Sequence, residues 1–307
     1  MVSVFHNPSY QTTYPKLSVL IPFFHDDPSA LIDALSFQTE QSSVEIILVD
    51  DGTGDAALTR NLQTLISQQT LAISLVTFEG NKGRSAARNH LQNVARAEWL
   101  LFLDADMRPT STQFLENYLK VINDNKADVF FGGFTVERKS VNKAGELHRA
   151  LSEVSDCLPL AERKAAGPQF VASSNLCLRK SVITEHPFDD AFVGWGWEDS
   201  DWAARISTSY RLEHIDNPAL HLGLESTETL LRRFQTSGQN YRRFIEKHPD
   251  LAKTLTLYKL SRSLGKIPGQ KFMRPFLRAI VKSPSPMKAR LVALKLWRAS
   301  WYAEALS

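Results

Sequence analysis

Cysteine is scarce in this sequence, and long apolar runs are absent. Only Cys157 and Cys177 occur among 307 residues, too few for a disulfide framework or a cysteine-based zinc site. We therefore expect two buried or partly buried thiols in a reducing compartment. No apolar stretch is long enough to span a bilayer, and residues 1–17 lack an apolar run behind a basic region, so we expect neither a membrane span nor a signal peptide. We expect the protein to be cytoplasmic.

Acidic residues are nearly missing from the C-terminal part of the chain. From residue 253 onward, twelve lysines and arginines accompany one acid, Glu304, so this segment carries a net charge of +11. Since the whole chain carries +3, residues 1–252 carry −8. Such a division indicates two parts with separate tasks, and we predict one domain over residues 1–250 and a basic helical tail over 251–307. An acidic body would be repelled by a polyanion, which argues against nucleic-acid binding.

The first hundred residues alternate short apolar runs with helix-forming segments. Residues 17–21, ended by a proline, 44–49, 71–77 and 99–103 read as buried strands, and residues 28–38, 56–68 and 85–95 read as helices. Strands joined to helices by short connections favour a mostly parallel sheet with helices on both faces. We expect residues 1–16 to be an irregular lead-in.

The middle of the chain is patterned less clearly. Residues 128–136, 170–178 and 210–215 are expected to be strands, and residues 225–247 one helix with a basic portion. Residues 137–169 are charged and weakly patterned, so we expect an insertion or a loop on the acceptor side. Arg149 in this segment and Phe170 directly after it are candidates for selecting the sugar and the acceptor.

A helix that starts near Met287 is imperfectly amphipathic. It would place four apolar side chains on one face: Leu291, Leu294, Trp297 and Trp301. Arg290 and Arg298 interrupt this face, and Lys288 and Lys295 lie at its edge. A helix of this kind can lie in a lipid headgroup layer and attract anionic lipid. The alternatives are a helix packed inside the protein and a dimer contact.

Carboxylates follow two of the predicted strands. Asp104 and Asp106 come directly after residues 99–103, and side-chain alternation along a strand would point both the same way. Asp50 and Asp51 follow the strand over 44–49. The carboxyl ends of parallel strands meet at one edge of a sheet, where open α/β sheets bind ligands. Paired carboxylates there suit Mg²⁺ or Mn²⁺, which share their remaining coordination with substrate phosphates; a turn is the alternative for Asp50 and Asp51.

Five motifs in a fixed order resemble those of nucleotide-sugar glycosyltransferases of family 2. They are LSVLIP at 17–22, ILVDDG at 47–52, NKGRSAARN at 81–89, LFLDAD at 101–106 and GWGWEDSD at 194–201. The last is also similar to a segment of β-1,4-galactosyltransferases and of bacterial polymerases that build chondroitin-like chains. The resemblance covers residues 17–223 and implies a GT-A (Rossmann-like) α/β fold, with a catalytic domain over residues 1–250 and the basic helical extension behind it.

The resemblance also implies a donor site and a metal site. The donor-binding residues would be Pro22, Asp50, Asp51, Lys82, Arg84, Arg88 and Asp104. The metal ligands for Mn²⁺ or Mg²⁺ would be Asp104, Asp106 and His221, the aspartates forming a DxD motif. A surface histidine bonded to backbone is the alternative for His221. A bound divalent cation would stabilise the negative charge that the departing diphosphate gains.

The acceptor side is implied by the segment at 194–201. Asp199 would be the general base that takes the proton of the acceptor hydroxyl, and Glu198 would hold the acceptor. Trp195, Trp197 and Trp202 are candidates for stacking on sugar faces, with Trp195 and Trp197 preferred, although aromatic side chains also fill cores. Acids in the first turn of a helix are also favoured by its dipole, which would keep Asp199 ionised.

These implications lead to one predicted activity. We expect a metal-dependent, inverting hexosyl- or N-acetylhexosaminyltransferase that moves a sugar from a UDP-sugar to a saccharide or lipid-linked acceptor in surface-glycan synthesis, at the inner face of the cytoplasmic membrane. A retaining enzyme and a catalytically silent glycan-binding or membrane scaffold are the alternatives. A sugar-1-phosphate nucleotidyltransferase would need a glycine-rich phosphate loop after the first strand, where residues 22–27 read PFFHDD.

Overall fold

The chain forms two compact units in the computed structural model, which describes residues 2–38, 42–137, 143–167 and 170–307. The first unit comprises Met1–Thr135, Pro159–Asp190 and Trp202–Gly223, and the second comprises Val136–Leu158, Ala191–Asp201 and Leu224–Ser307. The second unit therefore joins the C-terminal helices to two earlier segments of the chain. The division into residues 1–250 and 251–307 stays a prediction.

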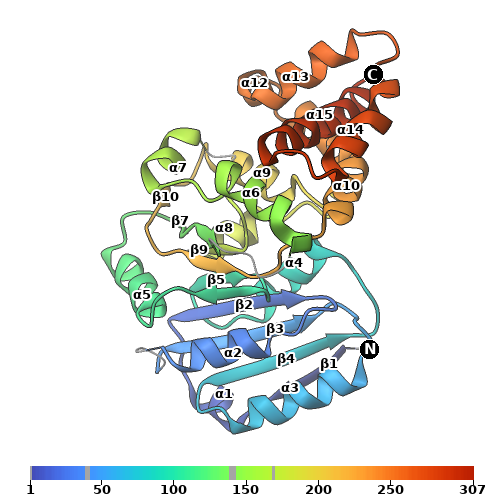
Figure 1. The fold of residues 1–307 in the computed structure, drawn as a ribbon. Helices are drawn as coiled ribbons and strands as arrows, with labels where there is room; N and C mark the ends of the chain where they lie inside the picture. The colour runs from blue at the N-terminus through green and yellow to red at the C-terminus, as the bar shows by residue number, and fades with distance from the viewer. Residues whose placement is uncertain (1, 39–41, 138–142, 168–169) are drawn as a thin grey trace. The chain divides into compact units, whose positions relative to one another are not determined.

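The first unit is built on a mostly parallel eight-stranded sheet (Figure 1). Its strands, in spatial order, are β1 (Val2–His6), β4 (Ala72–Phe78), β3 (Val44–Asp50), β2 (Leu17–Phe23), β5 (Trp99–Leu103), β9 (Asn175–Arg179), β7 (Val129–Phe131) and β10 (Leu212–His214). β2, β3, β4 and β5 run parallel, as does β10 to β7, while β1 and β9 pair antiparallel with their neighbours. The predicted mostly parallel sheet is confirmed.

Helices cover both faces of this sheet, because the side chains that point to each face of the strands are apolar. On one face Val19, Ile46 and Leu101 pack with α2 (Ser29–Ser36), α3 (Ala56–Gln68) and α5 (Phe114–Asp124). On the other, Leu20 and Ile47 pack with α4 (Arg84–Val94), α8 (Lys180–Glu185) and the C-terminal part of α9 (Glu198–Ile206). Trp202 of α9 is fully buried in this second layer, so it is a core residue and not a sugar-stacking one.

A second, three-stranded sheet completes the first unit. It has the order β6 (Met107–Pro109), β11 (Ala219–His221) and β8 (Phe134–Val136). β11 pairs antiparallel with β6, so that His221 lies opposite Met107. The strand expected over 128–136 is thus two short strands, β7 and β8, belonging to different sheets.

The prediction for residues 1–16 is wrong, and the described part of residues 137–169 is mostly helical where an insertion or a loop was expected. Residues 1–16 contain a strand, β1, and a short helix, α1 (Pro8–Thr12). β1 pairs along its whole length with β4, more than sixty residues away, from Val2 opposite Phe78 to His6 opposite Ser74. The described part of 137–169 contains η1 (Lys143–Gly145), α6 (Glu146–Ser155) and α7 (Leu160–Ala166); residues 138–142 and 168–169 lie outside the described residues.

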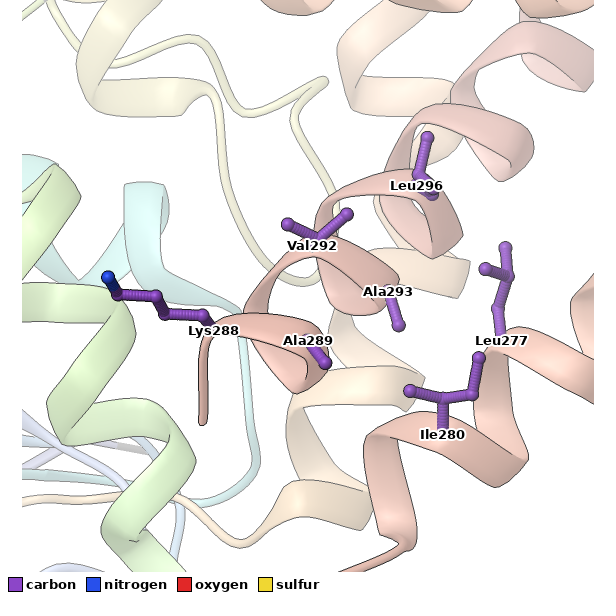
Figure 2. A pocket seen from close by; sticks show the side chains of 7 residues that line it. All are labelled: Leu277, Ile280, Lys288, Ala289, Val292, Ala293 and Leu296. Atoms are coloured by element: carbon purple, nitrogen blue, oxygen red, sulfur yellow. The ribbon is translucent and has the colours of Figure 1, made fainter. Parts of the chain in front are cut away.

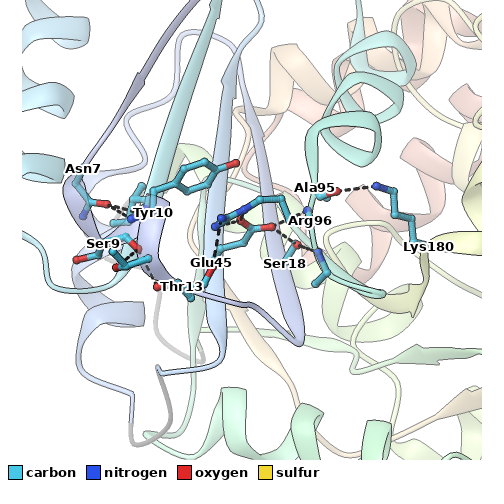
Figure 3. A network of polar contacts seen from close by, with 12 residues as sticks. Asn7, Ser9, Tyr10, Thr13, Ser18, Glu45, Ala95, Arg96 and Lys180 are labelled. Atoms are coloured by element: carbon cyan, nitrogen blue, oxygen red, sulfur yellow. Dashed lines mark hydrogen bonds and ion pairs between the residues drawn. The ribbon is translucent and has the colours of Figure 1, made fainter.

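A buried polar network lies at the amino ends of the strands, opposite the edge that the motifs point to (Figure 3). Glu45, fully buried near the start of β3, accepts a 2.6 Å hydrogen bond from the Ser18 hydroxyl and a 2.6 Å bond from Nε of Arg96. The Arg96 guanidinium lies 3.9 Å from the centre of the Tyr10 ring. These contacts link the beginnings of neighbouring strands and belong to the fold.

Helices make up the second unit. Besides η1, α6 and the first turn of α9, these are α10 (Thr227–Thr236), α11 (Gly238–Lys247), α12 (Pro249–Thr254), α13 (Thr256–Gly265), η2 (Gln270–Met273), α14 (Arg274–Lys282) and α15 (Met287–Ala305). The single helix expected over 225–247 is two helices, α10 and α11, joined at Ser237. The basic tail is helical, as predicted.

The apolar face predicted for the last helix is packed inside the second unit. Leu294 is fully buried and Trp297 almost so, in a cluster with Leu147 of α6 and Leu231 of α10. The indole N–H of Trp297 donates a 3.0 Å hydrogen bond to the carbonyl of Leu231. The prediction that this face contacts lipid is therefore wrong, because its side chains are used by the core.

Two further expectations concern the cysteines and membrane spans. Cys177 is buried and Cys157 partly buried, and both are free thiols, as predicted. Among the described helices, none combines the length and the apolar character that crossing a bilayer requires.

Candidate active site

The carboxyl ends of β2, β3 and β5 bring together most of the predicted donor residues. β2 runs through Pro22 to Phe23, two residues beyond the predicted end. Pairing with β5 stops at Leu20, so the missing N–H of Pro22 costs no ladder hydrogen bond on that side. Phe23 lies opposite Asp50 in β3, and its carbonyl accepts a 2.9 Å hydrogen bond from the N–H of Asp51.

Asp51 organises the loop that carries the basic motif. Its carboxylate accepts hydrogen bonds from the N–H of Lys82 at 2.7 Å, the N–H of Gly83 at 2.9 Å and Nδ2 of Asn81 at 3.0 Å. Burial raises the pKa of Asp51, and the two backbone N–H groups oppose part of that rise. Asp50 is also buried, and its Oδ1 accepts a 2.8 Å bond from the N–H of Thr53. Asp51 thus holds the loop at 81–83, and Asp50 holds the turn that follows its own strand.

The cations of the basic motif at 81–89 differ in their exposure to solvent. Lys82 and Arg84 are exposed, with Nζ of Lys82 lying 4.2 Å from the centre of the Phe78 ring. Arg88 is buried on α4, where its guanidinium lies 3.2 Å from Oδ1 of Asp104. The first turn of α4 therefore presents Arg84 to solvent and directs Arg88 toward the end of β5.

Asp104 and Asp106 differ in their partners. β5 ends at Leu103, and a turn closed by the N–H of Met107 bonding to the Asp104 carbonyl follows. The alternation argument for these two side chains does not apply, because residues 104–106 are not in a strand. Asp104 bonds to Arg88, whereas Oδ2 of Asp106 lies 3.1 Å from Nε2 of His221.

The pairing of β6 with β11 explains why Asp106 and His221 meet although 115 residues separate them. The N–H of Leu222 donates a 2.9 Å bond to the carbonyl of Asp106, which fixes the two backbones together. Burial raises the pKa of the Asp106 carboxyl, but the hydrogen bond with His221 and the nearby Arg84 outweigh it, and the net pKa is below the usual value. Asp106 is therefore a carboxylate at neutral pH.

Asp106 and His221 supply part of the ligand set that a divalent cation needs. An anionic carboxylate and an imidazole nitrogen, both partly exposed, are ordinary ligands of Mn²⁺, which completes its coordination with phosphates and water. No cluster of three or more His, Cys, Asp or Glu side chains arranged to hold a metal occurs among the residues that the structure describes. The structure thus brings together two of the three predicted ligands, Asp106 and His221, and joins Asp104 to Arg88.

The segment at 194–197 in the second unit has an unusual backbone. Gly194, Gly196 and Trp197 have φ values of 83°, 90° and 78°. A bulky residue rarely adopts positive φ, so surrounding contacts must hold Trp197 there. Nδ2 of Asn240 on α11 donates to the carbonyls of Val193 at 3.0 Å and Gly196 at 3.1 Å.

Aromatic rings hold the indole of Trp197. The rings of Phe244 and Tyr241 lie 4.8 Å and 4.9 Å from it, centre to centre, and its N–H donates a 3.2 Å bond to the hydroxyl of Tyr302. The ring of Trp195 packs against fewer aromatic rings, with the centre of the Phe234 ring 5.6 Å away. Both side chains are partly exposed.

Helix α9 begins directly after this turn, with Glu198, Asp199 and Asp201 in its first turn. Asp201 is fully buried, and its Oδ1 lies 2.8 Å from Nζ of Lys247 and 2.9 Å from Nε2 of His248. Glu198 is buried and Asp199 partly exposed. The ion pair of Asp201 therefore anchors the helix start that carries Glu198 and Asp199.

Sequence reasoning did not single out Gly223 or Asn240. A Cβ at Gly223 would lie 1.8 Å from Oδ2 of Asp106, so a larger residue there would displace that carboxylate. The glycine two positions after His221 was a signal of close approach. Nothing in the local sequence marks Asn240, which acts on a segment more than forty residues away.

Comparisons with known proteins identify the family. Residues 18–185, more than half of the chain, match the sequence profile described as "Glycosyl transferase family 2". The chain belongs to this family. It is 26% identical over 227 residues to polypeptide N-acetylgalactosaminyltransferase 6 of Bos taurus, covering 67% of this chain and 34% of that protein. It is 27% identical over 175 residues to poly(ribitol-phosphate) beta-glucosyltransferase of Bacillus spizizenii, covering 55% of this chain and 26% of that enzyme.

Solved structures establish the fold. The mannosyltransferase PcManGT from Pyrobaculum calidifontis, in complex with GDP-Man and Mn²⁺, superposes with a TM-score of 0.59 at 17% identity, over 95% of this chain and 88% of that one. S. aureus TarS 1-349, in complex with UDP-GlcNAc, gives a TM-score of 0.55 at 15% identity, over 95% and 90%. The predicted GT-A fold is confirmed, and the chain spans about a third or less of the two curated relatives.

Proposed function

We propose that this family 2 protein transfers a hexosyl or N-acetylhexosaminyl group from a UDP-sugar to a saccharide or lipid-linked acceptor, with inversion at the anomeric carbon. The observation that carries the proposal is the pairing of Asp106 with His221 at the carboxyl edge of the sheet. Their 3.1 Å separation, beside exposed Arg84, offers two ligands for a cation where open α/β sheets bind ligands.

Asp106 and His221 would hold Mn²⁺ or Mg²⁺, as their chemistry allows and as the Mn²⁺ complex of the mannosyltransferase supports for the fold. When bound, that ion would supply a Lewis acid for the diphosphate leaving group. Arg84 and Lys82 would bind the diphosphate oxygens, since both are exposed cations close to that edge. Arg88 is a positioning residue: it would hold Asp104 toward the ribose.

The nucleoside would lie over the ends of β2 and β3. Pro22 and the loop that Asp50 and Asp51 order would form its cradle, with Asp51 acting through the N–H groups it holds. A solved complex with UDP-GlcNAc on this fold supports a UDP-sugar, and one with GDP-Man shows that the fold also accepts another nucleotide.

The acceptor would be handled by the start of α9. Asp199 would take the proton of the attacking hydroxyl, and Glu198 would orient the acceptor. Trp195, which has fewer ring contacts than Trp197, is the better candidate for stacking on a sugar; Trp197 would mainly hold the turn. The name of the Bacillus relative, a poly(ribitol-phosphate) beta-glucosyltransferase, supports a polymeric acceptor. In surface-glycan synthesis the protein would work at the cytoplasmic membrane face.

Donor binding is the first test. Calorimetry of the full chain with UDP-, GDP-, CDP- and dTDP-sugars, each with and without Mn²⁺, is expected to show metal-dependent binding of the UDP class. Asp106→Asn should weaken that binding about tenfold or more, because the ion loses its anionic ligand. Asp124→Asn makes the same chemical change on an exposed acid at the end of α5, so it serves as the matched control and should bind normally.

Product analysis is the second test. Asp199→Asn should bind donor and metal like the natural chain yet lose about two or more orders of magnitude in transfer rate. Nuclear magnetic resonance of the product should show inverted anomeric configuration. Near-normal turnover of Asp199→Asn would refute the base assignment, a retained configuration would refute inversion, and folded protein that binds no nucleotide would favour the silent scaffold.

A further inference from the structure

The C-terminal helices expose large apolar side chains that the core of the second unit leaves uncovered. Phe272 and Phe276 are each 74% exposed, Val292 is 57% exposed and Ile280 is 39% exposed. They come from η2, α14 and α15. We call these four side chains the tail surface. They are not the residues that the helical pattern of the sequence singled out, which are packed inside.

The four side chains form a strip over elements that pack together, since η2 and α15 both contact α14. Phe276 and Ile280 lie four residues apart on α14, which places them along one side of that helix. Phe272 lies in η2, directly before α14. Ile280 then lines a shallow groove between α14 and α15 together with Val292, Leu296 and Lys288 (Figure 2). In this view Val292 and Lys288 project from α15, while Ile280 and Leu277 belong to α14. The strip therefore crosses from one helix to the next.

Cations border the strip. Lys271 precedes Phe272, and Lys288 and Lys295 stand on α15 close in sequence to Val292; all three are exposed. None of the three has an ion pair with a residue that the structure describes. Arg278 and Lys282, by contrast, share Glu228, and the one acid of the tail, Glu304, is paired with Arg274. The rim of the strip is thus positive without a compensating acid among the described residues.

We propose that the tail surface binds an anionic phospholipid membrane. Exposed phenylalanines between lysines match the interfacial pattern, in which rings enter the acyl boundary while the long lysine stems keep their ammonium groups among the phosphates. A second copy of this chain would bring the same +11 tail against this one, and like charges would repel. An anionic bilayer supplies both an apolar layer and the opposite charge.

Vesicle flotation tests the proposal without any sugar donor, so its result is independent of the transferase proposal. The full chain is mixed with vesicles of phosphatidylglycerol and phosphatidylcholine in equal amounts, and with phosphatidylcholine alone. Binding is expected to the anionic vesicles and to weaken as salt is raised. The double variant F272S/F276S should bind about tenfold or more weakly. Phe37→Ser, which removes a 79% exposed phenylalanine from the first unit, should bind normally.

Two charge-reversal variants test the role of the lysines. K288E/K295E should lose binding, whereas K120E/K126E, which makes the same charge change on exposed lysines of the first unit, should lose much less. Circular dichroism and thermal melting should match the natural chain in every variant, since the altered side chains are exposed. Failure of the natural chain to bind anionic vesicles, or equal binding by F272S/F276S, would overturn the proposal. So would a dimer in sedimentation that F272S/F276S converts to monomer.

Discussion

At the scale of single residues, the space around Asp106 is as restrictive as its charge. Asp106 pairs with His221, and the backbone of Gly223 approaches from the same strand end. A Cβ at position 223 would lie 1.8 Å from Oδ2 and 2.8 Å from Cγ of Asp106, far inside van der Waals contact. The position of the carboxylate therefore depends on the absence of a side chain two residues beyond His221.

We predict that Gly223→Ala displaces Asp106 and weakens metal-dependent donor binding about tenfold, because the Asp106 side chain or the end of β11 must move. Calorimetry with a UDP-sugar and Mn²⁺ measures the change. Gly265→Ala is the matched control, since its added Cβ would meet Ala303 at an ordinary 3.9 Å. Unchanged donor affinity in Gly223→Ala would show that the carboxylate position does not matter for binding.

At the scale of elements, α11 supports the start of α9 through two contacts. Asn240 near the beginning of α11 holds the carbonyls of the turn at 193–196. At the other end, Lys247 and His248 hold buried Asp201 in the first turn of α9. A turn with several left-handed residues is costly by itself and persists only when its neighbours hold it. The geometry of Glu198 and Asp199 thus depends on α11.

Asn240→Ala should lower the free energy of unfolding by about 1–2 kcal/mol, because the partly buried carbonyls of Val193 and Gly196 lose their donor. It should also reduce kcat while leaving the affinity for the nucleotide sugar unchanged, since the change lies at the acceptor side. Gln239→Ala, which alters the exposed neighbour, serves as control and should behave like the natural chain. A loss of donor affinity equal to the loss of kcat would contradict a role confined to the turn.

At the scale of the whole molecule, stability should depend on pH through a buried histidine. His214 at the end of β10 is 7% exposed and lies edge-on to Phe131. Burial lowers the pKa of His214 from 6.5 to about 4, and Arg163 and Lys164 add repulsion. The unfolded chain therefore binds a proton at this site at a higher pH than the folded chain does.

Because of that difference, the folded protein loses stability as the pH falls. The contribution of His214 to stability is complete above pH 6.5 and is lost as the pH falls from 6.5 toward 4. We expect a loss of about 1–3 kcal/mol over this range. Urea unfolding of the natural chain and of His214→Gln at several pH values measures it, and the variant should show a smaller slope. The exposed His6→Gln control should keep the natural slope; identical slopes in all three would contradict the assignment.

Local patterns in the sequence determined much of the first unit. Apolar runs bounded by polar residues located β2 to β5, and α3 was predicted at its observed bounds, because burial on both sheet faces leaves a signal in adjacent residues. β1 escaped prediction because its side chains are mostly exposed and its partner, β4, lies far along the chain. The order of five motifs was sufficient to suggest the family that the profile match confirms.

Only the tertiary structure decided which side chains meet. Asp106 meets His221 because β6 pairs with β11, and Asp104 meets Arg88 because α4 packs on the same face of the sheet as Leu100 and Phe102 of β5. Neither pairing leaves a periodic trace in the sequence. The same holds for the C-terminal helices, where periodicity selects Leu294 and Trp297 as one face but packing buries that face and exposes Phe272 and Phe276. A helix pattern reports which residues share a side, and only the neighbouring elements determine whether that side faces the core or the surroundings.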